Sequence, residues 1–338
     1  MNSTVESMIQ ELSRGNPSYL PSKFWQTLNE KNISQIEGDG FATFKRTVAQ
    51  NYFTWVIGRK ADQYRWLVRQ TRWRDWPSIR WGAGAVDPSL PLSRHQQKEL
   101  AIFTRMLWRL AERTDQQGLL RNLEEPAEGT PFPFHWRGKL ISQDLANSLL
   151  EYYAIREHFA PGSEERVTVC ELGAGYGRNA FVFLKALPRC KYIIVDIPPA
   201  LWVAERYLTR VFPERRAFKF RPFAGFDEIA DEFQAADLAF LLPHQAEMLP
   251  RKSVNLFLNI SSLHEMTPDQ IQAYFRLIDN LTRDYFYSKQ WIVSHNPHDG
   301  VVIRQADYPI PAGWRQLYSR TAKVQEKFFE AMYAVDGK

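Results

Sequence analysis

Short apolar runs alternate with helix-like segments over the later two thirds of the chain. Four of these runs predict buried strands, over residues 167–170, 192–195, 238–242 and 254–260. Runs of this length, bounded by turn residues, are typical of parallel strands buried on both faces. Two further strands are predicted, over 285–293 and, near the end, over 328–335. A polar loop is expected over 294–300. The pattern indicates an α/β fold.

The segments between these runs carry helix signals. Residues 178–187 have apolar side chains at helical spacing, and Pro188 ends the pattern. Ser142 is a predicted N-cap before a helix that leads into the first strand. Thr267 and Gln270 form a predicted capping box, with proline at the first helical position. Helices and strands therefore alternate from about residue 142 onward.

Residues 1–121 have a different pattern, with helical spacing and no strand run or glycine loop. Apolar and aromatic side chains recur at this spacing over 41–55 and 100–110. The segment 123–134 contains three prolines and a glycine, which marks a linker or an ordered loop. We therefore expect a helical N-terminal region, 1–121, that serves as a lid, a substrate-binding part or an oligomerisation part. The α/β domain is expected over 122–338.

Composition sets the outer bounds. The chain has 338 residues, of which 44% are hydrophobic, enough for a substantial core. Its formal charge of +5 permits phosphate-bearing partners without requiring nucleic acid. We see no signal peptide and no apolar run long enough to span a bilayer. With only Cys170 and Cys190, reduced thiols and a cytoplasmic location are expected. The sequence leaves open whether the chain forms a homo-oligomer.

The most informative motif is a glycine loop between the first two predicted strands. It reads ELGAGYG over 171–177, and Asp196 ends the second strand. Glycines at alternate positions let the backbone turn sharply and approach a ligand. An acid at the tip of the second strand can accept hydrogen bonds from ribose hydroxyls, because ligands of such sheets bind beyond the carboxyl ends of the strands. The motif predicts a nucleoside-containing cofactor.

The spacing separates two cofactor classes. A dinucleotide motif, G-x-G-x-x-G or G-x-G-x-x-A, would need Gly or Ala where this chain has Arg178. Glu171 precedes the loop, and an acid there would repel a pyrophosphate but suit the cationic end of S-adenosylmethionine. NAD or FAD binding, and a loop that binds nothing, stay open as weaker alternatives. The predicted cofactor-binding residues are Glu171, Gly173, Ala174, Gly175, Tyr176, Gly177, Asp196, Ile197, His244 and Asn259.

Four segments resemble the sugar O-methyltransferase family of bacterial glycan clusters. They read GKLISQDLANS (138–148), CELGAGYGR (170–178), IVDIPPA (194–200) and NISSLHEM (259–266). The resemblance covers roughly 122–335. It implies a class I methyltransferase fold, with a seven-stranded, mostly parallel sheet whose last strand is antiparallel. It also implies S-adenosylmethionine-dependent methylation of a sugar hydroxyl, on a free sugar, a nucleotide sugar, a glycan or a glycosylated metabolite.

The segment after the 254–260 strand holds the candidate catalytic residues. This loop faces the methyl group in the class I fold, and the unperturbed pKa of a histidine suits a base near neutral pH. We predict His264 as the general base, with Glu265 orienting it or binding the sugar. One alternative is that the two residues simply tie the loop to the next helix. Another is that a different residue, such as His295 or His298, acts as the base. Arg178, Ser262, His295 and His298 are candidate substrate contacts.

A divalent metal is weakly indicated. His264, Glu265, His295, His298 and Asp299 could converge across two strand ends. Magnesium prefers an octahedron of carboxylates and waters, and this set offers only two carboxylates. We therefore predict no metal ligands.

An arginine- and tryptophan-rich stretch, 64–81, provides the competing function. Arg65, Arg69 and Arg72 would share one helical face that could meet a nucleotide diphosphate, an acidic glycan or RNA, unless it is simply solvated. A nucleic-acid methyltransferase is the alternative function. Base-amino methylation usually shows an Asn/Asp-Pro-Pro-aromatic element, where this chain has NISS over 259–262. No nucleic-acid partner is expected. A non-catalytic module that keeps the cofactor fold only as a scaffold also stays open.

Overall fold

The computed structural model describes residues 2–38, 40–52, 61–81, 90 and 92–335. An eight-stranded sheet forms its centre, with the strand order β11-β12-β8-β7-β3-β4-β6-β5. The strands are β3 (Val167–Leu172), β4 (Cys190–Val195), β5 (Ala217–Phe218), β6 (Leu238–Leu241), β7 (Val254–Ile260), β8 (Thr282–Trp291), β11 (Arg315–Thr321) and β12 (Phe328–Ala334). All neighbouring pairs are parallel except those of β12, which is antiparallel to both β8 and β11.

This sheet confirms the predicted α/β class I methyltransferase fold with an antiparallel last strand. Every residue of β4 and of β7 is buried, as the continuous apolar runs predicted. The expected count of seven strands was one short. The eighth strand, β5, is a two-residue edge strand beside β6, too short to leave a hydrophobic pattern.

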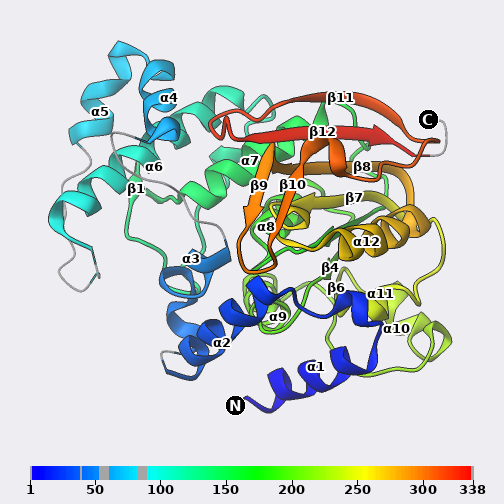
Figure 1. Ribbon diagram of the computed structural model, residues 1–338. Helices are drawn as coiled ribbons and strands as arrows, with labels where there is room; N and C mark the ends of the chain where they lie inside the picture. The colour runs from blue at the N-terminus through cyan, green and yellow to red at the C-terminus, as the bar shows by residue number, and fades with distance from the viewer. Residues whose placement is uncertain (1, 39, 53–60, 82–89, 91, 336–338) are drawn as a thin grey trace.

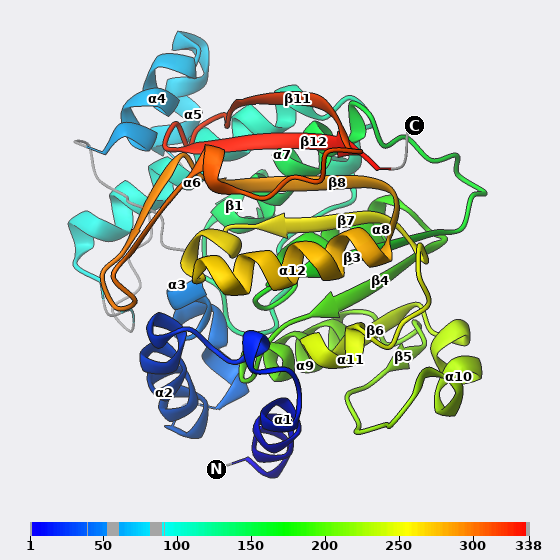
Figure 2. The same ribbon diagram turned by 45° about the vertical axis from the view of Figure 1, so that its right-hand side comes forward.

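The helices of the α/β part follow the predicted order. They are α7 (Gln143–Arg156), α8 (Arg178–Ala186), α9 (Ala200–Val211), α10 (Ala230–Ala235), α11 (Pro243–Ala246) and α12 (Pro268–Leu281). Ser142 caps α7, and Thr267 and Gln270 form the capping box of α12, as predicted. Figure 2 shows α12 in front of the sheet and α7 and α8 behind it. Helices therefore cover both faces.

Two small hairpins lie outside the sheet. One pairs β1 (His135–Trp136) with β2 (Lys139–Leu140). The other pairs β9 (Val293–Asn296) with β10 (Val301–Arg304). The prediction of a polar loop over 294–300 was therefore wrong in its first half. After β8, the chain continues as strand β9, in which exposed and buried positions alternate up to Asn296. Only residues 297–300 form the turn at the tip of the hairpin.

The described part of the N-terminal region contains helices and no strand. Its helices are α1 (Ser3–Arg14), α2 (Lys23–Gly38), α3 (Ala49–Tyr52), α4 (Asp62–Gln70), α5 (Trp76–Trp81) and α6 (Arg94–Thr114). Its short 3-10 turns are η1 (Pro17–Tyr19), η2 (Phe41–Arg46), η3 (Trp73–Asp75) and η4 (Leu119–Arg121). The described α/β part contains three more, η5 (Phe226–Glu228), η6 (Leu263–Glu265) and η7 (Gln305–Asp307). Figure 1 places α1 and α2 along one side of the α/β part, and α4 and α5 beyond α6.

Two predictions for this region need correction. The expected helix over 41–55 is a 3-10 turn, η2, followed by the four-residue α3, and residues 53–55 lie outside the described part. The arginine face predicted for Arg65, Arg69 and Arg72 is incomplete. Helix α4 ends at Gln70, and Arg72 has extended backbone angles, φ −69° and ψ 144°. Arg72 therefore cannot continue the face.

The N-terminal helices and the sheet share one hydrophobic core. Met8, Phe44 and Trp108, from the N-terminal region, belong to the same buried cluster as Val169 and Leu258 of the sheet. None of the described helices is both long enough and apolar enough to cross a bilayer. Cys170 and Cys190 are buried free thiols on β3 and β4.

Candidate functional site

The glycine loop follows β3 and turns directly into α8. Gly173, Gly175 and Gly177 all have positive φ, at 72°, 60° and 85°, which disfavours any residue with a Cβ. Gly173 is also crowded, because a Cβ there would lie 2.2 Å from Ser262 Oγ. The loop thus brings the end of β3 against the segment that follows β7.

Asp196, directly after β4, organises this loop. Its Oδ2 accepts a hydrogen bond of 2.8 Å from the Gly175 N–H, and its Oδ1 accepts one of 2.7 Å from its neighbour Ile197. Burial raises the pKa of Asp196 to about 7, although these two backbone donors act in the opposite direction. The carboxyl group therefore titrates near neutral pH.

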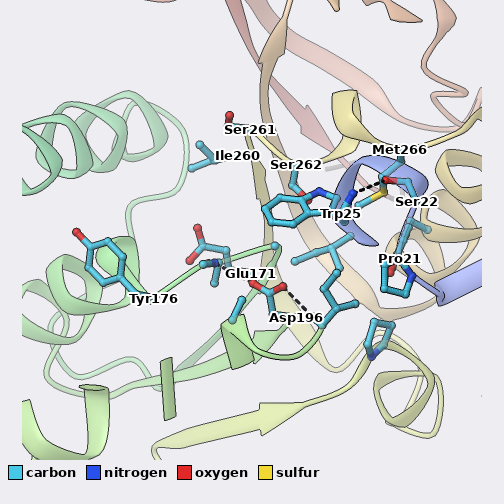
Figure 3. Close-up of a pocket in the computed structure, with 18 of the residues that line it drawn as sticks. Pro21, Ser22, Trp25, Glu171, Tyr176, Asp196, Ile260, Ser261, Ser262 and Met266 are labelled. Atoms are coloured by element: carbon cyan, nitrogen blue, oxygen red, sulfur yellow. Dashed lines mark hydrogen bonds between the residues drawn. The ribbon is translucent and has the colours of Figure 1, made fainter. Parts of the chain in front are cut away.

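A cavity opens at the carboxyl ends of β3, β4 and β7 (Figure 3). Its empty volume, including space open to solvent, is about 940 Å³. Of the predicted cofactor and substrate residues, those that line it are Glu171, Gly173, Ala174, Gly175, Tyr176, Arg178, Asp196, Ile197 and Ser262. The sheet topology thus gathers most of the residues selected from the motif around one space.

Glu171 is held inside the protein next to this cavity. Its Oε1 accepts a 2.9 Å hydrogen bond from Asn179 Nδ2, and its Oε2 accepts one of 2.7 Å from the Tyr192 hydroxyl. Burial raises the pKa of Glu171, against the effect of these two hydrogen bonds. Two donors therefore fix the orientation of this carboxyl group at the end of β3.

Arg178 lines the cavity as part of a buried ion network. Its Nη1 lies 2.6 Å from Glu151 Oε2 and 2.8 Å from Ser148 Oγ, both on α7. Lys289 of β8 donates to the other oxygen of Glu151, at 2.7 Å. Burial alone would raise the pKa of Glu151, but the two cations outweigh it and lower the pKa to about 2. The charge of Arg178 is thus offset by a carboxylate.

Three predicted cofactor residues do not line the cavity. Gly177 packs against α9, where a Cβ would lie 2.8 Å from Leu208 Cδ1. His244 faces α1, with Nε2 3.5 Å from Glu11 Oε1, although its neighbour Pro243 does line the cavity. Asn259 is completely buried, and its Nδ2 donates to the Leu172 carbonyl at 2.9 Å. The Asn259 contact ties the ends of β3 and β7 together.

His264 is buried beside the cavity, in the 3-10 turn η6. Its ring packs beside those of Trp291 and Phe328, with centroid distances of 6.1 and 6.0 Å. His264 Nδ1 lies 2.9 Å from Gln290 Oε1, and the Gln290 amide nitrogen donates to Asn259. Because Oε1 can only accept, Nδ1 carries the proton and Nε2 keeps its lone pair in the neutral ring.

Glu265 lies beside His264 because the 3-10 turn brings neighbouring side chains together. His264 Nε2 and Glu265 Oε1 are 3.6 Å apart. Burial lowers the pKa of His264 to about 4, and the Gln290 hydrogen bond opposes this. Burial raises the pKa of Glu265 to about 8, against a hydrogen bond from Trp25. Near pH 7 the histidine is therefore neutral and the carboxyl group mainly protonated. Neither side chain lines the cavity itself.

The N-terminal region supplies a wall of the cavity that sequence reasoning missed. The lining residues from this region are Tyr19, Leu20, Pro21, Ser22, Trp25 and Ala49. Ser22 Oγ donates to the Glu265 carbonyl at 3.1 Å, and Trp25 Nε1 donates to Glu265 Oε2 at 3.1 Å. Figure 3 shows Pro21, Ser22 and Trp25 beside Met266 and Ser262. No local motif marks this segment, because its role depends on contacts distant in sequence.

The hairpin of β9 and β10 supports this wall from outside. His295 and His298 are exposed and do not line the cavity. The His298 ring lies 5.7 Å from that of Phe24. Asp299 accepts hydrogen bonds from the backbone N–H groups of Lys23 and Phe24, at 3.1 and 3.3 Å, and so caps α2. Across the described residues, no group of three or more His, Cys, Asp or Glu side chains could hold a metal ion.

The arginines of the 64–81 stretch lie away from this cavity. None of Arg65, Arg69, Arg72, Arg74 and Arg80 lines it. Arg65 forms an exposed ion pair with Asp62, at 2.5 Å. The arginine-rich stretch and the glycine loop are therefore separate features of the structure.

Comparison with known proteins gives weak structural similarities. No protein-family model and no curated protein matches the chain. A 1,6-didemethyltoxoflavin-N1-methyltransferase from Burkholderia thailandensis, solved with S-adenosylhomocysteine, is similar at 15% identity and a TM-score of 0.39, over 57% of this chain and 78% of that one. A SAM-dependent methyltransferase from Aquifex aeolicus is similar at 14% identity and a TM-score of 0.35, over 56% and 97% of the two chains.

One further similarity extends over more of this chain. The mitomycin 7-O-methyltransferase MmcR is similar at 14% identity and a TM-score of 0.39, over 82% of this chain and 69% of that one. Similarities of this strength identify neither a family nor a substrate. The sugar O-methyltransferase resemblance in the sequence therefore stays a prediction.

Proposed function

We propose that this chain is an S-adenosylmethionine-dependent O-methyltransferase that acts on a sugar hydroxyl. The observation that carries the proposal is the placement of three acids and the glycine loop around one cavity. The charged side chains among its described lining residues are Asp144, Glu171, Asp196 and Arg178. Arg178 shares Glu151 with Lys289, and even with both cations counted, four carboxyl groups stand against two cations, so the cavity favours a cation over an anion.

The same residues discriminate between the two cofactor classes. A pyrophosphate needs uncompensated donors or cations at the loop, but Gly175 already donates to Asp196. A methyl donor with a cationic amino acid end instead benefits from the acids. Gly173 and Gly175 both line the cavity, and their positive φ values favour residues without a Cβ, so the loop presents main chain and no side chains of its own at these two positions. These residues fit S-adenosylmethionine and do not fit NAD or FAD.

When bound, the cofactor supplies an electrophilic methyl group. The chain must then exclude water, align an acceptor oxygen and remove its proton. Alignment supplies the largest part of the rate, and a positioned base adds roughly 10²–10⁴-fold. We assign the base to His264, because Gln290 fixes the tautomer that leaves Nε2 free to accept a proton. Glu265 would orient the histidine or bind the sugar.

In this proposal the N-terminal region, 1–121, is a lid over the domain 122–338. Support comes from Trp25 and Ser22, which line the cavity and bond to Glu265. Displacing Trp25 would open a path from the cavity to Glu265 and His264. The acceptor would enter there, and closure would then exclude water.

Calorimetry with S-adenosylmethionine, S-adenosylhomocysteine and NAD tests the cofactor. Binding of the first two and not of NAD supports the proposal, while NAD binding contradicts it. Transfer of a labelled methyl group to a panel of nucleotide sugars and glycans tests the acceptor. Transfer to RNA instead would reject the sugar assignment while keeping the methyltransferase.

A further inference from the structure

A second cavity lies between the N-terminal helices and the first hairpin. We name it the arginine hollow, and its lining residues are Pro77, Ser78, Arg80, Arg105, His135, Trp136 and Arg137. Arg80 comes from α5, Arg105 from α6, and Arg137 from the turn between β1 and β2. Figures 1 and 2 both place α5 with α6 at the end of the molecule away from α10. Among the described residues, none lines both the hollow and the cavity beside the glycine loop, which we name the methyl-donor cavity.

Arg105 is the unusual group in this hollow. Its exposed fraction is only 4%, and its Nε and Nη2 donate to the His135 carbonyl at 3.1 and 3.0 Å. Its Nη1 is buried and has no hydrogen-bond partner. No carboxylate of the described residues forms an ion pair with it. An arginine stays charged in a protein, so this is a buried cation with an unsatisfied donor, an arrangement that is costly without a bound partner.

The other charges of the hollow have the same sign. Arg80 and Arg137 are exposed at its rim, and no Asp or Glu occurs among its described lining residues. Two acids, Asp75 and Glu112, both pair with Arg109, whose guanidinium lies over the Trp136 ring. With these included, four arginines face two carboxylates, which leaves an excess of two positive charges. The electrostatics of the hollow therefore favour an anion.

The backbone of the hairpin presents these groups together. Arg137 and Gly138 have φ values of 50° and 84°, as a tight two-residue turn requires. This turn aims the Arg137 guanidinium over the Trp136 ring, with 5.7 Å between the guanidinium carbon and the ring centroid. The hollow thus combines guanidinium groups with the Ser78 side chain around the buried Trp136 ring.

We propose that the arginine hollow binds the phosphate groups of a small ligand. Guanidinium forks match the oxygens of phosphate and diphosphate in pairs, and three such groups from different elements converge here. In the bound state, the Arg105 side chain turns its unsatisfied Nη1 toward a phosphate oxygen, while Arg80 and Arg137 contact the phosphate from the rim. The proposal does not depend on the methyltransferase assignment.

Isothermal titration with inorganic pyrophosphate, UDP, uridine and glucuronate tests this site. Pyrophosphate and UDP should bind, with an affinity that falls as salt is added, and uridine should not. Tighter binding of UDP than of pyrophosphate identifies a nucleotide-linked source, and equal binding identifies the phosphate alone. Binding of glucuronate without binding of pyrophosphate or UDP overturns the proposal, and so does the absence of binding by both phosphate compounds.

Variants locate the binding on the structure. The double variant Arg80→Ala/Arg137→Asn keeps a residue that tolerates positive φ in the turn, and should weaken pyrophosphate binding at least about tenfold. Arg69→Ala/Arg72→Ala removes the same charge from exposed positions outside the hollow and should leave the affinity unchanged. Equal losses in both double variants overturn the proposal. S-adenosylmethionine binding, measured in the same samples, should be unaffected, so failure of the methyl-donor site and failure of the hollow are distinguishable.

Discussion

Trp25 Nε1 donates a hydrogen bond to Glu265 Oε2, at 3.1 Å, across a separation of 240 residues. The indole comes from α2 of the N-terminal region, and the carboxyl group comes from the turn that follows β7. Trp25 also lines the cavity beside the glycine loop. This bond therefore connects the N-terminal helices to the carboxyl group beside the candidate base.

The Glu265→Gln variant should change how stability depends on pH. The folded protein keeps the Glu265 proton until its pKa of about 8, while the unfolded chain releases it near the ordinary glutamate pKa of 4.5. The folded state thus binds more protons between these pH values, so the free energy of unfolding falls as pH rises through this window. Urea unfolding across the window should show a shallower fall in Glu265→Gln.

Trp25→Phe is the matched control for this prediction. It keeps an aromatic ring but removes the N–H group that favours the carboxylate form, so it should raise the pKa of Glu265 further. The fall in stability should then extend to higher pH. Parallel curves for wild type and Glu265→Gln would show that Glu265 does not titrate in this range.

Removal of His264 should lower turnover and spare cofactor binding. His264→Gln removes the proposed proton acceptor, and we expect a loss of at least about tenfold, consistent with the usual contribution of a positioned base. The affinity for S-adenosylmethionine should stay unchanged, because His264 does not line the cavity. Single-turnover methyl transfer and calorimetry measure the two effects separately. Near-normal turnover would exclude His264 as the base.

Gln290→Met tests whether Gln290 positions His264. The variant removes the acceptor for Nδ1 and leaves the histidine in place. Because the Gln290 hydrogen bond opposes the lowering of the His264 pKa, its loss should lower that pKa further. The acidic limb of the pH–rate profile should move to lower pH, together with a smaller loss of turnover. A uniform loss without such a shift would indicate a purely structural role.

The parts of the fold predictable from sequence are those encoded locally. The apolar runs of β4 and β7 are buried along their whole length, so periodicity alone located them. The capping residues Ser142 and Thr267 satisfy backbone donors one turn away, and a local pattern suffices to find such contacts. The glycine loop was also predictable, since positive φ values restrict the residue type at each position.

The rest of the site depends on contacts between distant segments. The sequence motif did not reveal that Arg178 pairs with Glu151 of α7, which in turn pairs with Lys289 of β8. His244 follows Pro243 at the cavity, yet its ring faces Glu11 of α1. The wall around Trp25 likewise has no periodicity that distinguishes it from a core helix. Such partners become evident only when the packing of the N-terminal helices is known.

Gly173→Ala should weaken cofactor binding through Ser262. The added Cβ would lie 2.2 Å from Ser262 Oγ, so the serine must move, and the positive φ of 72° adds strain. We expect at least about a tenfold loss of S-adenosylmethionine affinity, equivalent to 1.4 kcal/mol. Gly173→Ala/Ser262→Gly removes the clash and should recover part of the affinity. If it recovers none while Ser262→Gly alone binds normally, backbone strain and not crowding explains the loss.

Glu151→Gln should destabilise the protein strongly. The side chains of Glu151 and Lys289 are 2% and 3% exposed, so the variant leaves Lys289 and Arg178 as buried cations without a carboxylate. Breaking a buried ion network from one side costs about 3–5 kcal/mol. Urea unfolding at neutral pH should show this loss. Glu157→Gln, at a more exposed ion pair with Arg320, is the control and should cost below about 1 kcal/mol.

Cofactor affinity should increase with pH around neutrality because of Asp196. Burial raises the pKa of this carboxyl group to about 7, so a large fraction is protonated near pH 7 in the free protein. Binding of a cationic ligand whose hydroxyls donate to Asp196 favours the ionised form and must release a proton. Calorimetry in buffers of different ionisation enthalpy measures this release of protons, which should decline as pH rises above the pKa of Asp196.

The Asp196→Asn variant is the control. It removes the titrating group and should bind the cofactor more weakly, with an affinity that changes little with pH over the same range. An equally steep pH dependence in the variant would assign the titration to another group, with Glu171 the first candidate because burial also raises its pKa.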